Sequence, residues 1–356
     1  MKKIQSTIVL ALLLSVIFFS FPRIEVYAEQ NTLVVPDDYG SIQEAIDNAL
    51  IGDIVYVRSG DYHENVLINK SLSLIGENVD TTVIDGFPTL ETRRIPIRIN
   101  ADNVSVSCFK ILYGYAGIQL ASVKNCVISG NRIAGGVHGI LLSCSENNNI
   151  TENYFESIGS SGSIRLWGSS NNFVYKNYIT AFVEGIQIYS SHNNTVAENT
   201  IENCTVVTTV NVGIRFQNSH QNTITRNTIT DAGTGIVIYT SNNNTIYHNN
   251  FINNIEQLSA NEWYAQTFGY TYSNNTINEN YWTDYPGEDV DGNGFGDSAY
   301  VIDEHNQDNN ALMTKVDITK IPEFPTWTIL PILSTITLVV IIAKQKLKQN
   351  ANKGAF

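Results

Sequence analysis

Charged side chains are scarce in this chain. Asp, Glu, Lys and Arg make up only 15% of its 356 residues, and the formal net charge is −13. No basic cluster occurs before the C-terminal tail. Domains that bind nucleic acid usually carry a basic patch or stripe, so nucleic acid is not a predicted partner.

Residues that commonly hold metal ions are few and scattered. The four cysteines are Cys108, Cys126, Cys144 and Cys204, and none shares a repeat position with another. An even number of cysteines permits disulfides in an oxidising compartment, but this spacing assigns no pairs. The histidines lack metal-ligand spacing, and no His, Met and Cys cluster of the kind that binds copper occurs.

Asparagine, by contrast, recurs with a regular period. Eight stretches between Val104 and Trp282 mostly read Asn-x-Ile/Val-x-x-Asn-x-Ile/Phe. We call the second Asn of each stretch the anchor; the anchors are Asn131, Asn153, Asn177, Asn199, Asn227, Asn249 and Asn280, with Phe109 at this place in the earliest copy. Successive anchors from Phe109 to Asn249 are 22, 22, 24, 22, 28 and 22 residues apart, which indicates a stacked repeat.

A second motif keeps a constant distance from the anchors. It reads Gly-Ile-x-Leu/Ile or a near variant, and its Ile always lies 13 residues before the anchor. The extra residues of the longer copies therefore fall in one gap, where Glu156–Gly162 and Glu202–Gly213 are lengthened. Apolar residues two apart indicate strands, and a coil of about 22 residues holds about three of them. We predict an all-β, right-handed parallel β-helix whose coils stack about 4.8 Å apart.

The anchor column is predicted to form a turn. An Asn can adopt the left-handed backbone conformation, and its amide can bond to the Asn one coil above. A polar binding face is the alternative, but the regularity of the column favours the structural role. The residues before the anchors predict a solvated ion ladder and not a catalytic carboxylate pair; they are Glu152, Lys176, Glu198, Arg226, His248 and Glu279.

Three stretches resemble known proteins. The residues from Gly52 to Gly76, followed by Val83-Ile-Asp-Gly86, resemble the opening of pectin-lyase-like β-helix proteins. The Asn-x-Ile-x-x-Asn copies resemble NosD-type, carbohydrate-binding and sugar-hydrolase (CASH) repeats, and Asn280–Asp303 resembles the ending of archaeal members of that group. The resemblance implies the fold over about residues 32–313. It implies no single activity, because the family holds enzymes, binding proteins and a copper-related accessory protein.

The two ends of the chain predict an extracellular protein with a membrane anchor. Residues 1–28 read as a secretory signal, with an uncleaved anchor as the alternative. Residues 321–343 comprise a Pro-Glu-Phe-Pro lead-in and eighteen mostly apolar residues from Thr326 to Ala343, enough for a transmembrane helix. The lysines of residues 344–356 predict a cytoplasmic tail. The lead-in also resembles the tails of archaeal surface proteins that are cut and re-anchored, so a processed anchor is the alternative.

Between these ends, residues 29–285 are assigned to the β-helix and residues 286–320 to a C-terminal cap and stalk. A helix is predicted from Ser41 to Leu50, because Ser41 and Glu44 form a capping box and an apolar stripe follows. This helix would cover the first coil, whose open strand edge could otherwise recruit other strands.

One outward column supplies candidate binding residues. If Ile164 and Leu166 point inward, the residues that follow each of them point outward, and neighbouring coils add equivalents. The predicted substrate-binding residues are Arg165, Trp167, Gln187, Tyr189, Arg215 and Tyr239. Aromatic faces beside Arg and amide groups suit sugar rings with hydroxyl or carboxylate groups, whereas an ordinary β surface is the alternative.

A loop near the C-terminal end has the spacing of a calcium-binding loop. Positions 1, 3, 5, 7 and 9 are matched by Asp289, Asp291, Asn293, the Phe295 carbonyl and Asp297, with Gly294 at the sharp turn. Position 12 is Tyr300 and not the usual bidentate Glu. We predict a structural calcium ion, with a plain acidic turn as the alternative.

These features favour a cell-surface protein that binds carbohydrate or forms part of the envelope. A polysaccharide lyase or glycoside hydrolase is the second hypothesis, and a rigid structural spacer is the third. No catalytic residue is predicted, because lyases of this fold use Asp-bound calcium and the coils hold no compact Asp cluster. Acidic residues gathered beside Arg165 or Arg215 would favour the enzyme, and a flat polar face would favour the spacer.

Overall fold

The computed structural model describes residues 30–86, 94–156, 158, 161–180, 183–202, 211–260 and 274–318. The predicted signal sequence, transmembrane segment and basic tail lie outside these residues. No helix in the described part of the chain is long and apolar enough to cross a membrane. The chain divides into two compact units, Met1–Asn172 and Phe173–Phe356.

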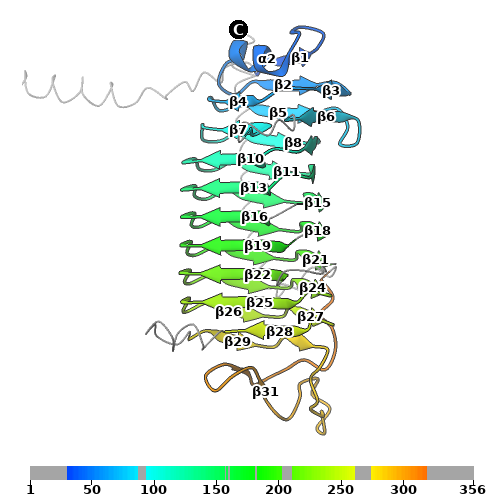
Figure 1. Ribbon diagram of the computed structural model, residues 1–356, viewed down its shortest axis with the longest axis vertical. Helices are drawn as coiled ribbons and strands as arrows, with labels where there is room; N and C mark the ends of the chain where they lie inside the picture. Colours follow the sequence, from blue (N-terminus) through cyan, green and yellow to red (C-terminus); the bar gives the residue numbers. More distant parts are fainter. Residues whose placement is uncertain are drawn as a thin grey trace, which may run out of the picture. The chain divides into compact units, whose positions relative to one another are not determined.

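The first unit is a parallel β-helix built from three sheets (Figure 1). Sheet A contains β1 (Thr32–Val35), β2 (Ile54–Val57), β5 (Ser73–Gly76), β8 (Ser105–Ser107), β11 (Val127–Ser129) and β14 (Asn149–Thr151). Sheet B contains β3 (Gly60–Tyr62), β6 (Thr82–Asp85), β9 (Lys110–Leu112), β12 (Arg132–Ala134) and β15 (Tyr154–Glu156). Sheet C contains β4 (Val66–Ile68), β7 (Ile97–Ile99), β10 (Ala116–Ala121), β13 (His138–Ser143) and β16 (Gly162–Trp167).

The helix α2 (Ile42–Asn48) follows β1 at the beginning of the first unit. The Ser41 hydroxyl accepts the backbone N–H of Glu44, which caps the first turn. The Glu64 carboxylate accepts two further N–H groups of that turn, at 3.0 Å each. The apolar side of the helix is buried and packs against β1, β2 and β4.

The second unit repeats the same three-sheet coil (Figure 1). Sheet A contains β17 (Phe173–Tyr175), β20 (Thr195–Ala197), β23 (Thr223–Thr225), β26 (Thr245–Tyr247) and β29 (Thr276–Asn278). Sheet B contains β18 (Tyr178–Thr180), β21 (Thr200–Glu202), β24 (Thr228–Thr230), β27 (Asn250–Ile252) and β30 (Tyr281–Trp282). Sheet C contains β19 (Glu184–Tyr189), β22 (Val212–Gln217), β25 (Thr234–Tyr239) and β28 (Glu256–Ser259), and a short hairpin of β31 (Tyr300–Val301) and β32 (Gln307–Asp308) follows.

Equivalent residues of successive coils lie opposite one another in these sheets. In the first unit Ile128 pairs with Ile150 in parallel register, and in the second unit Val196 pairs with Ile224. All four side chains are fully buried. The core of each unit is thus a set of apolar columns. The predicted parallel β-helix with coils of about 22 residues is confirmed.

The anchor asparagines form a buried hydrogen-bond ladder, and Asn199 shows its pattern. The Oδ1 atom of Asn199 accepts both the backbone N–H and the Nδ2–H of Asn177, at 2.9 and 3.0 Å. Its Nδ2 donates to the carbonyls of Val174 and Ala197, at 3.0 and 3.1 Å, and to Oδ1 of Asn227 at 2.9 Å. The predicted structural role of the column is confirmed.

The left-handed residue of this turn precedes the anchor, so the prediction that the anchor itself is left-handed was wrong. Glu198, Arg226 and His248 have φ values of 54°, 56° and 54°. The physical reason is that the side-chain amide of each anchor must point into the protein, where it forms the ladder. At the same time, the backbone N–H of the anchor must donate to Oδ1 of the anchor in the next coil. The chain therefore bends one residue earlier, where the side chain points outward. Left-handed geometry costs a non-glycine residue about 1–2 kcal/mol, which the ladder offsets.

A second asparagine ladder, which the sequence analysis did not assign, lies five residues before the anchors. In the second unit, Oδ1 of Asn222 accepts the N–H and Nδ2–H of Asn194, at 2.9 and 3.0 Å. Asn222 in turn donates from Nδ2 to Oδ1 of Asn244 at 3.0 Å. In the first unit Asn148 and Asn172 make the same contacts. Two ladders, one at each of two turns, therefore hold the coils together.

The predicted ion ladder is also present in the second unit. The carboxylate of Glu198 lies 3.8 Å from Lys176 Nζ and 3.4 Å from Arg226 Nε. Nε2 of His248 lies 2.7 Å from the Glu279 carboxylate. Pairs at a protein surface contribute little each, about 0–1 kcal/mol, so they accompany the asparagine ladders and do not replace them.

An aspartate ends the anchor ladder at the C-terminal side. Asp308, which is fully buried, accepts the backbone N–H groups of Glu279 and Asn280 at 3.0 and 2.9 Å. It also accepts Nδ2–H of Asn280 and Nε1–H of Trp282. The Trp282 ring stacks between Phe251 and Tyr300, with ring centroids 4.4 Å from each.

The cysteines described by the structure are unpaired thiols. They are Cys108, Cys126 and Cys144, whereas Cys204 lies outside the described residues.

Candidate functional site

The candidate residues of the second unit lie on the outward face of sheet C. Gln187 of β19 pairs in register with Arg215 of β22. Tyr189 and Tyr239 lie in the neighbouring column, with Gln217 between them. The parallel register therefore brings these predicted residues together, as the spacing of the Gly-Ile motifs indicated.

Arg215 is held by a carboxylate that the sequence analysis did not single out. Its Nε donates to Oε1 of Glu184 at 2.7 Å, and each of the two side chains is only 13% exposed. The amide of Gln187 donates to the other oxygen of Glu184. Burial alone would lower the pKa of Arg215, but the charge of Glu184 and the hydrogen bond to Tyr239 raise it above its ordinary value. The guanidinium thus stays charged and is fixed in one position.

These contacts divide the roles of the second unit's candidates. Gln187 is 5% exposed and orients Glu184, so it is not placed to reach a ligand. The guanidinium carbon of Arg215 lies 5.3 Å from the centroid of the Tyr239 ring, a cation–π distance. Tyr239 and Tyr189 are partly exposed. The face is therefore aromatic on the outside, with the ion pair beneath it.

In the first unit, the candidates Arg165 and Trp167 lie together on β16. Trp167 is 55% exposed, one of the largest apolar side chains at the surface. The Arg165 guanidinium carbon lies 4.5 Å from the centroid of its ring. A cation–π contact of this kind contributes about 0.5–1 kcal/mol at an exposed site and steadies the indole. The unit thus presents a flat aromatic surface beside a positive charge.

A buried histidine lies behind this pair. His138 is 1% exposed, and its ring meets that of Tyr115 edge to face at 5.2 Å. Burial and then the charge of Arg165 lower the pKa of His138 to about 4, against a smaller opposing effect of a hydrogen bond to the Gly162 backbone. His138 is therefore neutral in the folded protein at neutral pH.

The predicted calcium loop is closed by its own side chains. The carboxylate of Asp289 accepts the backbone N–H groups of Asn293 and Gly294, at 3.0 and 2.9 Å, which lowers its pKa. Asp297 accepts the N–H of Val290 at 2.7 Å. The side chain of Asn293 accepts the N–H of Phe295. Over the described ranges, no three His, Cys, Asp or Glu side chains lie close enough together to hold a metal ion. Calcium binding stays a prediction.

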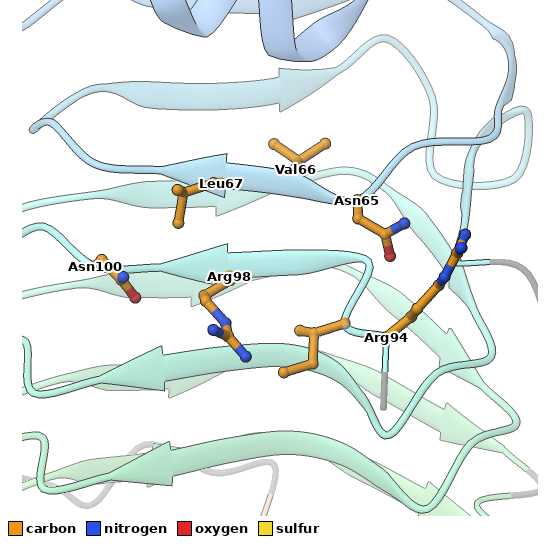
Figure 2. Close-up of a pocket in the computed structure, with 7 residues that line it drawn as sticks. Asn65, Val66, Leu67, Arg94, Arg98 and Asn100 are labelled. Atoms are coloured by element: carbon orange, nitrogen blue, oxygen red, sulfur yellow. The ribbon is translucent and has the colours of Figure 1, made fainter. Parts of the chain in front are cut away.

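The structure also contains a surface pocket that the sequence analysis missed (Figure 2). It lies over β4 and β7 of the first unit and has a volume of about 310 Å³. The lining residues are Asn65, Val66, Leu67, Arg94, Ile95, Arg98 and Asn100. The coils here precede the regular Gly-Ile and anchor motifs, so no repeat pattern drew attention to them.

A family profile described as periplasmic copper-binding protein (NosD) matches residues 76–287, more than half of the chain. The chain belongs to the NosD family. A cell surface glycoprotein of Methanothermus fervidus is 35% identical over 124 residues, which are 34% of this chain and 20% of that protein. This chain thus spans about a fifth of the length of that curated relative.

Solved structures share the fold of this NosD-family chain. The A-module of the Azotobacter vinelandii mannuronan C-5 epimerase AlgE4 is 16% identical, with a TM-score of 0.54 over 69% of this chain and 84% of that one. The A-module of the mannuronan C-5 epimerase AlgE6 of the same organism is 14% identical, with a TM-score of 0.49 over 71% and 86%. At this identity the likeness concerns the fold alone.

The residues of this chain do not fit a copper site, although the family description names copper. Copper in proteins is usually held by His, Cys and Met side chains. His192 and His220 stack with centroids 5.2 Å apart, but Nδ1 of His192 accepts the N–H of His220, and Nδ1 of His220 accepts that of Asn242. No third His or Cys joins them in a metal-binding group within the described part of the chain. We derive no copper chemistry for this protein.

Proposed function

We propose that this chain is an extracellular β-helix protein of the cell surface that binds acidic polysaccharide through the outward face of sheet C. The relation to a cell surface glycoprotein and the NosD family supports the location. The mannuronan C-5 epimerase module of the same fold supports a polysaccharide as the ligand class. The predicted signal sequence, membrane anchor and cytoplasmic tail complete the proposal.

The observation that carries the proposal is the exposed Trp167 ring held against Arg165. Sugar rings stack on aromatic faces, and guanidinium groups bind carboxylates. Tyr189 and Tyr239 provide the corresponding surface in the second unit, with Arg215 fixed beneath Tyr239. Both faces present an aromatic ring held against an arginine, which suits the apolar side of a sugar, and in the first unit Arg165 also supplies a cation for the carboxylate of a uronic acid.

Binding is favoured over catalysis by what surrounds the arginines. Glu184 is the carboxylate that contacts Arg215, and this ion pair holds it away from a role as a catalytic acid or base. A glycoside hydrolase needs two carboxyl groups about 5–9.5 Å apart with room for the sugar between them. The Glu184 carboxylate beside Arg215 is already bound to Arg215 and Gln187. A spacer is expected to have a flat, uniformly polar face. The outward face of sheet C instead carries exposed aromatic rings.

Retention on immobilised uronic-acid polymers tests the proposal. Trp167→Ala is expected to weaken retention by about tenfold, since truncating a central aromatic contact costs more than about 1 kcal/mol and about 1.4 kcal/mol corresponds to tenfold. The double variant Trp167→Ala with Arg215→Ala should weaken it further. Phe173→Ala is the control, because Phe173 is a 37% exposed aromatic residue of sheet A. Equal retention of all variants would contradict the proposed face, and release of unsaturated or reducing products would establish an enzyme.

We also propose that the loop from Asp289 to Asp297 binds calcium as a structural ion. The side chains that match the calcium-loop positions, together with Gly294 at a φ of 91°, support this. Terbium luminescence should show one saturable site excited through the nearby aromatic rings, and Asp289→Asn should weaken it at least tenfold. A linear, unsaturated signal in the wild type would leave the loop as a plain turn.

A further inference from the structure

The pocket over β4 and β7 gathers two arginines without a lining carboxylate. Arg98 extends from β7, and Arg94 from the segment that leads into it (Figure 2). No acidic residue of the described part of the chain lines the pocket. The chain as a whole has a net charge of −13, so an exposed arginine with no described carboxylate at its pocket is available to an anionic ligand.

Arg98 differs in its surroundings from four other described arginines. These four lie in ion pairs: Arg58 with Asp37, Arg132 with Glu156, Arg215 with Glu184 and Arg226 with Glu198. Arg98 is exposed and makes no ion pair or hydrogen bond with any side chain in the part of the chain that the structure describes. Its guanidinium therefore presents its donors to solvent in a fork that matches a carboxylate.

The rest of the pocket suits a sugar ring. Leu67 pairs in register with Arg98 across the sheet and is 37% exposed, an apolar surface beside the cation. Asn65 lies toward the same end of the pocket as Arg94, and Asn100 lies toward the other end (Figure 2). Amide groups at both ends can exchange hydrogen bonds with hydroxyl groups. A pocket of about 310 Å³ accommodates a single sugar residue with its bound water.

The position of the pocket connects it with the proposed binding face. Arg98 is followed in register by Gln119, Leu141 and Arg165 on β10, β13 and β16. The two arginines thus lie in one outward column of sheet C, three strand spacings or about 14 Å apart. A linear polysaccharide lying along this column would meet a cation near both places.

We propose that this pocket binds one uronic acid residue of an acidic polysaccharide. Arg98 pairs with the carboxylate, Asn65 and Asn100 bond to ring hydroxyls, and Leu67 packs against the apolar side of the ring. The choice of ligand rests on the proposed function. The pocket adds to that function a subsite on β4 and β7 that binds the negatively charged group of the polysaccharide.

Calorimetric titration of the full-length chain tests this subsite. The probes are oligomers of galacturonate, mannuronate and glucuronate, each compared with its uncharged methyl ester. Arg98→Gln should weaken binding of at least one acidic oligomer about tenfold or more, because it removes a charged hydrogen-bonding partner. The methyl esters should bind weakly to the wild type and the variant alike. Lys110→Gln, which removes one positive charge from sheet B, should bind as the wild type does.

The outcomes separate the subsite from the proposed face. If Arg98→Gln binds as tightly as the wild type while Trp167→Ala binds less tightly, the subsite is refuted and the proposed function stands. The reverse result supports the subsite and refutes the role of Trp167. Inorganic sulfate that competes as strongly as the monomeric uronates would overturn the sugar assignment and leave a plain anion site. Absence of binding to all three acidic oligomers overturns both.

Discussion

Removing one rung of the anchor ladder tests the interaction that stacks the coils. Asn199→Ala deletes five buried hydrogen bonds while leaving the backbone free to keep its extended geometry. The N–H of Asn177 loses its acceptor, and the carbonyls of Val174 and Ala197 each lose a donor. Asn177 keeps its side-chain bond to the Tyr175 carbonyl at 3.2 Å.

The expected cost follows from the groups left without partners. A buried donor or acceptor that loses its partner costs about 1–3 kcal/mol. The orphaned N–H of Asn177 falls in this range, and the two carbonyls and the Oδ1 of Asn227 lose about 0.5–1.5 kcal/mol each. Since these effects are not additive, we expect Asn199→Ala to lower the free energy of unfolding by about 3–5 kcal/mol. Most domains are stable by only about 5–15 kcal/mol, so the loss is large.

Urea unfolding followed by circular dichroism measures this loss, with Thr200→Ala as the matched control. Thr200 is the next residue, points outward on β21 and is partly exposed, so its truncation should cost less than about 1 kcal/mol. Hydrogen exchange of a peptide that contains Asn177 should accelerate in Asn199→Ala and not in Thr200→Ala. If both variants unfold at the same urea concentration, the ladder does not stabilise the coils and the reasoning fails.

Two further perturbations probe the end of the ladder and the buried histidine. Asp308→Ala removes the acceptor of five N–H groups and should loosen the last coil, seen as a red shift of Trp282 fluorescence and faster exchange around Asn280. Asp308→Asn keeps an acceptor and should loosen the coil less. His138 has a pKa of about 4 when folded against 6.5 when unfolded, so its contribution is complete above pH 6.5 and is lost as the pH falls toward 4. In the wild type, the resulting loss in the free energy of unfolding should reach about 3 kcal/mol. This loss should be absent from the pH profile of His138→Gln. His63→Gln, which changes an exposed histidine, should keep the wild-type dependence of unfolding free energy on pH.

The columns of the fold were predictable because stacking turns a one-dimensional period into a vertical contact. A residue such as Ile128 meets Ile150 for no reason other than their 22-residue separation. Local backbone geometry was less predictable, since the period does not say which residue of the turn is left-handed. That choice depends on where the anchor amide must point, and the structure places the bend at the residue before, as at Glu198.

The pairing of Arg215 with Glu184 could not be predicted from the sequence for a different reason. The two residues lie 31 positions apart and belong to coils separated by a lengthened corner. Glu184 lies just before a Gly-Ile motif, at the beginning of β19. Its place in the coil could therefore be predicted, but the direction in which its side chain points could not. An acidic residue immediately before this motif, one coil from an outward Arg, is the signal that could have found the pair.

Whether each arginine is paired with a carboxylate of the protein decides which ligands the outward face of sheet C can bind. Arg215 has its charge neutralised by Glu184 in a site where both are largely buried, so its effect on a ligand passes through the Tyr239 ring. Arg98 is exposed, and none of the described residues that line its pocket is a carboxylate, so its charge acts directly on a ligand. Coulomb attraction weakens with distance and with the screening of an intervening counter-charge. Selection of acidic over neutral sugars should therefore depend on the first unit, whereas the second unit contributes aromatic surface that a neutral sugar can use equally well.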